Sequence, residues 1–310
     1  MKQHIFLGGV LVLLLLSCNK NNSSNDDKSA ISEKNILDNE TTEITKVSIS
    51  DSLIQTLNSI PSPIETAFQI KENGGEFNAN FLNPSDKFDQ YESSSVLALN
   101  LGIYSADLAY CNIYENKDAT KYLGAVYEVS KPLGLESHFD FEGMMNLMKN
   151  DHSNLDSMLQ ITTEKFEDIN KELQEENKSH FSVLMLVGGW IEGLHLLTSV
   201  YELNPSQPIK ERIGEQKIVL SQLIGLVKFY KDKDDTILNV FNHLTHLSAT
   251  YEGIKIMRSS NEEVEIVMDT ELNIPVAIPK GTSMIIISDS EINEIIKNLN
   301  HIRTYIINKN

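Results

Sequence analysis

The stretch that decides the fold runs from residue 179 to residue 203 and has the sequence SHFSVLMLVGGWIEGLHLLTSVYEL. Large apolar side chains cover nearly the whole circumference of the helix that this stretch would form. A helix that is apolar all round is normally buried, so we expect it at the centre of a helical bundle. Gly189 and Gly193, four residues apart, would let a neighbouring helix approach closely.

One narrow polar stripe interrupts this apolar helix. It comprises four residues on one side of a helical wheel, namely Gly188, Glu192, His195 and Ser199. The Glu192-x-x-His195 spacing is the one by which a helix offers two ligands to a metal in di-iron bundles. Such bundles need a second pair of this kind, and the sequence contains none. Three interpretations stay open: a hydrogen-bonded pair in the core, a polar cleft for a ligand, and a metal site.

A second carboxylate with an apolar context is Asp107, in LALNLGIYSADLAYCNIY at 97–114. It shares a helical face with three residues, Tyr104, Cys111 and Tyr114. A carboxylate facing the core must be hydrogen-bonded or lose its charge, so a Tyr–Asp network is one expectation. If Asp107 instead meets Glu192 and His195 across the bundle, these side chains form the default site.

His243-x-x-His246 on a later helix is another candidate pair of ligands. On a helical wheel His243 flanks the apolar stripe of that helix, whereas His246 lies well away from it. The two imidazoles therefore cannot both face the core.

The fold class expected is all-α, a multi-helix bundle or helical-hairpin array of about eight or nine helices. Capping boxes at Ser62–Glu65 and Ser288–Glu291 mark two helix starts. The exception is 262–287, where two prolines and a glycine interrupt alternating apolar residues, so we expect a small β-hairpin or extended insertion. A helix over 261–270 stays open. The helices are expected at about 62–75, 94–114, 118–134, 139–149, 152–176, 180–203, 207–231, 236–257 and from 288 to the end.

The amino terminus has the pattern of a secretion signal. Residues 5–16 carry no charge and are too few to span a bilayer, which takes about 20 residues. Leu15-Leu16-Ser17-Cys18 follows, and the chain then turns polar. This pattern resembles the lipobox of bacterial lipoproteins. The resemblance implies cleavage before Cys18, whose thiol then carries diacylglycerol and whose amino group carries an acyl chain.

This resemblance sets the expected organisation: a signal peptide at 1–17, a lipidated flexible tether at 18–49 and a single helical domain at 50–310. The polar tether cannot bury enough surface to offset its ordering entropy. We expect the lipid anchor in place of a spanning helix, with no second membrane element. Asn19 does not match the signal that retains lipoproteins in the inner membrane. This mismatch favours the outer membrane, where the protein would lie on the periplasmic face or at the cell surface.

The charge and cysteine content limit the possible partners. With 26 basic and 44 acidic residues, the formal charge is -18, which repels phosphate backbones, so nucleic acid is not an expected partner. If Cys18 is lipidated, Cys111 has no disulfide partner in the chain and is expected to be a buried core thiol.

The sequence therefore favours an envelope lipoprotein whose helical domain is a non-enzymatic module that binds an envelope protein or small ligand. The alternative is a metal-binding helical protein that uses Glu192 and His195, and a hydrolase without a recognisable motif is a weaker third. No cofactor is predicted beyond the lipid on Cys18. The mature domain resembles, in general style, uncharacterised all-helical envelope lipoproteins.

Overall fold

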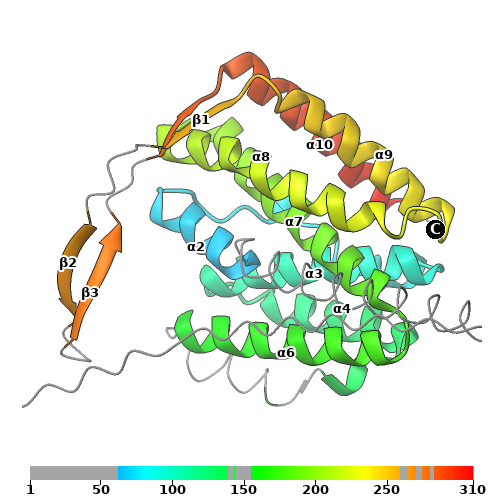
Figure 1. Cartoon of the computed structure of the whole chain (residues 1–310). Helices are drawn as coiled ribbons and strands as arrows, with labels where there is room; N and C mark the ends of the chain where they lie inside the picture. The colour runs from blue at the N-terminus through cyan, green and yellow to red at the C-terminus, as the bar shows by residue number, and fades with distance from the viewer. Residues whose placement is uncertain are drawn as a thin grey trace, which may run out of the picture. The chain divides into compact units, whose positions relative to one another are not determined.

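The computed structural model describes residues 62–138, 143, 155–258, 264–269, 274–279 and 283–309 (Figure 1). Within these residues lie eight α-helices and four short strands, which confirms the predicted all-α fold with a small β insertion. The helices are α2 (Pro63–Glu72), α3 (Ser94–Ile113), α4 (Ala119–Ser130), α6 (Leu155–Glu175), α7 (Ser179–Leu203), α8 (Gln207–Lys228), α9 (Asp235–Thr250) and α10 (Asp289–Ile307).

Several sequence predictions lie outside the described residues. These are the signal peptide, the tether with Cys18, and the helix at 139–149 apart from Gly143, which is helical.

Both predicted capping boxes are present. The hydroxyl of Ser62 accepts from the N–H of Glu65 at 3.1 Å, and the Glu65 carboxylate accepts from the N–H of Ser62 at 2.6 Å. Ser288 and Glu291 make the same reciprocal pair at the start of α10. Each box satisfies two of the amide groups that a helix start leaves without a partner.

Helix α7 lies at the centre of the bundle, as its sequence predicts (Figure 1). It packs most extensively against α3, and α2, α6, α8 and α10 also contact it. Helix α4 packs on α3, while α9 packs against both α8 and α10. Because α10 returns to contact both α7 and α3, the carboxyl-terminal helix closes the bundle over its central pair.

The backbones of α3 and α7 touch where each helix has a glycine. A Cβ atom on Gly102 would overlap the carbonyl oxygen of Met185, and one on Gly188 would overlap that of Leu99. A side chain at either position would therefore force the two central helices apart.

The sequence analysis assigned this close approach to Gly189 and Gly193. The structure shows that this assignment was wrong, because a Cβ atom at neither position would make a tight contact. A Cβ on Gly189 would lie 3.5 Å from the carbonyl oxygen of Gly102, and one on Gly193 would lie 3.7 Å from Thr66 of α2. Both distances are ordinary van der Waals contacts. Gly188, which the sequence placed in the polar stripe, makes the tight contact.

Two of the described helices, α3 and α7, are long and apolar enough to cross a membrane by length and composition, although none was expected after the signal peptide. In each, most of the apolar window is buried inside the bundle, 83% in α3 and 89% in α7. Such burial is typical of the core helices of a bundle, which pass the same test.

Helix α9 ends at Thr250, so the predicted helix over 236–257 is wrong beyond that residue. Tyr251, Glu252 and Gly253 form a turn, and the chain then enters a strand. Glycine disfavours helix by about 1 kcal/mol, whereas the β-branched residues that follow favour strand.

The insertion is made of two antiparallel pairs of strands, as expected for a hairpin. Strand β1 (Lys255–Arg258) pairs with β4 (Ser283–Ile286), and β2 (Val264–Asp269) pairs with β3 (Ile274–Pro279). Ile285 of β4 is buried against α8, where a Cβ on Gly214 would meet it. The insertion therefore begins as an extension of the helical core.

We predict that Gly102→Ala and Gly188→Ala each destabilise the fold by about 3 kcal/mol or more, because the new methyl group meets backbone that cannot move aside. Gly124→Ala and Gly225→Ala are matched controls, since a Cβ there meets nothing within 4 Å. Both controls sit in helices and should gain about 0.5–1 kcal/mol. Urea unfolding measures all four, and equal effects would contradict the backbone contact.

Candidate functional site

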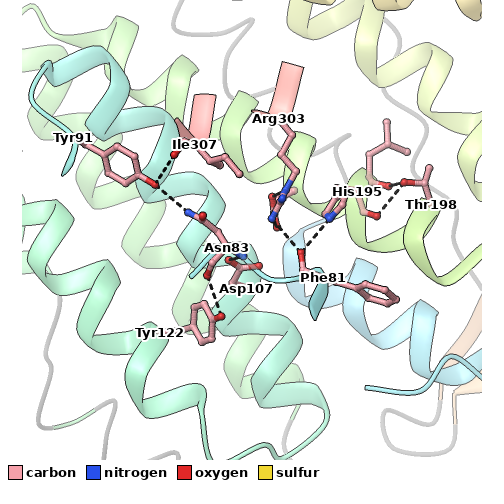
Figure 2. Close-up of polar contacts among 11 residues, drawn as sticks. Phe81, Asn83, Tyr91, Asp107, Tyr122, His195, Thr198, Arg303 and Ile307 are labelled. Atoms are coloured by element: carbon pink, nitrogen blue, oxygen red, sulfur yellow. Dashed lines mark hydrogen bonds and ion pairs between the residues drawn. The ribbon is translucent and has the colours of Figure 1, made fainter. Parts of the chain in front are cut away.

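The structure brings together three of the residues that the sequence singled out. Asp107 of α3 lies against Glu192 of α7, and His195 follows Glu192 by one helical turn. Figure 2 shows Asp107, Arg303 and His195 in the same region of the bundle. Asp107 and Glu192 are both fully buried. Asp107 therefore meets Glu192 across the bundle, as one sequence interpretation had it, whereas no described contact joins Asp107 to His195.

Arg303 of α10 completes this polar cluster. Its Nε donates to one carboxylate oxygen of Glu192 and its Nη2 to the other, both at 2.6 Å. The side chain of Arg303 is 12% exposed and that of Glu192 is 0% exposed, so the ion pair is screened from water. A bidentate pair of this kind fixes the positions of both helices.

A single backbone oxygen links Arg303 to His195. The carbonyl of Phe81, in the short helix η1 (Ala79–Phe81), accepts from Nη2 of Arg303 and Nε2 of His195, each at 3.1 Å (Figure 2). Because a carbonyl can only accept, Nε2 of His195 carries the proton. The cluster therefore anchors the segment between α2 and α3 to α7 and α10.

Asp107 occupies a place that disfavours a charged carboxylate. Its Oδ2 accepts from the N–H of Asn83 at 3.1 Å, whereas Oδ1 has no donor among the described residues. Burial and then the charge of Glu192 raise the pKa of Asp107 well above its ordinary value, and Arg303 offsets this in part. The proton belongs on Asp107 rather than Glu192, because Glu192 accepts from Arg303 with both oxygens.

The charges of the cluster then sum to zero. Burial opposes the charge on Arg303, but Glu192 and then Asp107 raise the pKa of the guanidinium, which stays charged. Burial lowers the pKa of His195 and Arg303 lowers it further, while Glu192 acts in the opposite direction. A neutral Asp107 and a neutral His195 thus surround one compensated ion pair.

Tyrosine hydroxyls hold the irregular segment after α2 in place. Each donates to a backbone carbonyl of this segment, and the bond from Tyr122 is buried. The pairs are Tyr114 to Gly75 at 2.6 Å, Tyr110 to Glu76 at 3.1 Å, Tyr104 to Pro84 at 3.0 Å and Tyr122 to Asn83 at 3.0 Å. The predicted Tyr–Asp network is therefore indirect, because the tyrosines and Asp107 bind the same segment and not each other.

The other predicted residues lie outside the cluster. Ser199 is buried one turn beyond His195 and joins none of the described hydrogen bonds of the cluster. Cys111 is a free, fully buried thiol whose pKa is raised by burial, as expected of a core cysteine.

Arg303 and Asn83 are the two members that the sequence analysis missed. Arg303 had a signal, because it lies four residues after Leu299 and seven after Ile296, within the apolar stripe of α10. A charge in the middle of such a stripe must have a buried partner. Asn83 lies in a loop, where no periodicity identifies its position.

Glu192 has no free carboxylate oxygen to offer a metal ion. Both of its oxygens are held by Arg303, a cation that would repel a metal ion. In the part of the chain that the structure describes, no group of three His, Cys, Asp or Glu side chains could hold a metal.

A surface pocket of about 590 Å³ lies apart from the cluster, between the loop before α3 and helix α4. Ser85, Asp86 and Phe88 line it from the loop, and Gly124 and Tyr127 line it from α4. Its volume is within the range of small-ligand sites.

A scan against protein-family models and searches of curated proteins and of solved structures found no match to this chain. The residues themselves therefore carry the functional argument.

We predict that Asp107→Asn flattens the dependence of stability on pH. The pKa of Asp107 is 3.8 in the unfolded chain and raised in the fold, so above pH 3.8 the folded chain holds the extra proton. Its stability then falls as pH rises toward the folded pKa, by up to about 1.4 kcal/mol per pH unit. Asparagine mimics the neutral acid and lacks this loss. Urea unfolding between pH 5 and 8 measures it, with exposed Asp86→Asn as control; parallel profiles for wild type and Asp107→Asn would refute the assignment.

We predict that Arg303→Met costs about 3–5 kcal/mol, because it leaves Glu192 buried without its counter-ion. Glu192→Met costs less, since Asp107 can ionise and pair with Arg303. The double variant should be more stable than Arg303→Met, because two apolar side chains replace the pair. Denaturant unfolding of the wild type, the two single variants and the double variant measures this double-mutant cycle. Glu215→Gln is the control: it breaks the surface pair with Arg212 and should change the stability by about 1 kcal/mol or less. Additive single effects would disprove the coupling.

Proposed function

We propose that this protein is a lipid-anchored lipoprotein of the bacterial cell envelope whose helical domain is a non-enzymatic binding module. The anchor is the lipid on Cys18, and the outer membrane is its membrane. The module binds an envelope protein or a small ligand, and it needs no cofactor.

The anchor rests on the first eighteen residues, where an uncharged run of signal-peptide length leads into Leu-Leu-Ser-Cys. Two or more acyl chains hold a protein stably at a bilayer, whereas one does not. A polar segment then separates Cys18 from the helical domain. This order suits a domain held close to the membrane and free to meet a partner.

The observation that carries the binding role is the closure of the polar cluster by Arg303. Among the described residues, Glu192 accepts from Arg303 with both oxygens, and the carbonyl of Phe81 accepts from Arg303 and His195. Asp107 accepts from the N–H of Asn83 with one oxygen. A reaction centre presents such groups to a substrate, whereas these stabilise the fold. The pocket beside α4, in contrast, opens outward and has the volume of a ligand site.

The alternative metal role at Glu192 and His195 receives no support from this geometry, because the guanidinium of Arg303 lies where a cation would bind. We therefore favour the binding module.

We predict that metabolic labelling with a palmitate analogue marks the wild-type protein and leaves Cys18→Ala unlabelled, because the thiol is the site of lipidation. Labelling of the two proteins in parallel cultures, followed by gel fluorescence, measures this. Cys111→Ala is the matched control and should label as wild type. Equal label on Cys18→Ala would eliminate the anchor.

The same strains test the binding role. After formaldehyde treatment of intact cells, the anchored wild type should form a discrete adduct that Cys18→Ala loses together with its membrane position. If the wild type forms none, the protein-binding half of the proposal fails while the anchor stands.

A further inference from the structure

Histidines gather at the junction of α9 and α10, away from the polar cluster. His243 of α9 lies between two rings of α10: the centroid of His301 is 5.2 Å away with planes at 68°, and that of Tyr305 is 4.9 Å away. His243 is half-buried, whereas His301 is exposed to solvent. The ring contact of His243 is therefore with His301 of α10. His246 of α9 is exposed, in line with the expectation that His243 and His246 do not both face the core.

The separation of these two imidazoles suits a shared metal ion. With metal–nitrogen bonds of about 2.0–2.1 Å, each ring centroid lies about 3.2 Å from the ion, so two ligands at a tetrahedral angle have centroids about 5.2 Å apart. The observed separation is 5.2 Å. The two rings meet edge to face, so a shared ion requires the exposed His301 ring to turn about its side-chain torsions.

The charge state also suits a ligand. Burial lowers the pKa of His243, and the neighbouring His301 and His246 lower it further, so the ring is neutral at pH 7. Neutral imidazole is the form that binds a metal. The adjacent Tyr305 accepts a 2.7 Å hydrogen bond from Lys309, whose ammonium lies over the Tyr305 ring, so the Tyr305 hydroxyl is already engaged.

We propose that His243 and His301 together bind a divalent transition-metal ion and so link α9 to α10. Imidazole nitrogen favours Zn²⁺, Ni²⁺ and Cu²⁺ over Mg²⁺ and Ca²⁺. Because the described residues offer no set of three ligands, water completes the coordination. Structural zinc sites use four protein ligands, so this site fits reversible binding instead. The proposal stands independently of the binding role and of the Glu192 cluster.

The test is calorimetric titration of ZnCl₂ into the full chain, purified in detergent without a histidine tag. We expect one Zn²⁺ per chain in the wild type and affinity at least about ten-fold weaker in His301→Gln. His301 is exposed, so this variant keeps its fold; His243→Gln should show the same loss. His246→Gln is the matched control and should bind as wild type. Zn²⁺ should also raise the melting temperature of the wild type and not that of His301→Gln.

The outcomes separate the alternatives. Equal binding by the wild type and His301→Gln, or no saturable binding by the wild type, would overturn the site and leave the His243–His301 contact as ring packing alone. Loss of binding in His246→Gln with retention in His301→Gln would place the ion on α9 alone and overturn the link between helices. MgCl₂ in place of ZnCl₂ should give no saturable heat, and equal binding of Mg²⁺ would indicate carboxylate ligands and contradict the imidazole pair.

Discussion

The contact on which the structure depends is the one between the backbones of α3 and α7. Gly102 and Gly188 remove the side chains that would otherwise keep the two helices apart. Asp107 lies five residues after Gly102, and Glu192 lies four residues after Gly188, so each carboxyl group is about one turn from the point of closest approach. The packing that fills the core thus forces two carboxyl groups together where water does not reach.

That meeting limits what the rest of the fold can be. Two buried carboxylates repel each other, so one takes a proton and the other needs a cation. Arg303 supplies the cation, which fixes the rotation of α10 about its axis. The guanidinium also binds the carbonyl of Phe81, so the loop before α3 is held by the same group that neutralises Glu192. The position of the last helix and the path of the loop therefore depend on the close approach of α3 and α7 that Gly102 and Gly188 permit.

Much of this site can be predicted from the sequence, but the ion pair between Arg303 and Glu192 cannot. Helical periodicity placed Asp107, Glu192 and His195 on inward faces, and such faces meet in any compact bundle. Arg303 was missed although it lies within an apolar stripe, because periodicity describes one helix at a time and a buried arginine has meaning only with its partner. The end of α9 was missed for a related reason: a buried apolar residue such as Ile254 fits the pattern of a helix or of a strand, and the pairing of Lys255–Arg258 with Ser283–Ile286 is not visible in one segment alone.

Arg303 also provides the main polar link between α10 and the core among the described residues. Two further polar contacts reach the end of α10: Asn100 of α3 donates to the carbonyl of Ile306 at 3.4 Å, and Tyr91 of the loop before α3 donates to that of Ile307 at 3.5 Å. Both are long for hydrogen bonds and weak, so the bidentate pair with Glu192 is the strongest polar link between α10 and the core. Release of α10 would leave Glu192 buried and charged while removing a donor from Phe81. Arg303 therefore couples the loop before α3 to the last helix, because the same guanidinium bonds Phe81 and Glu192.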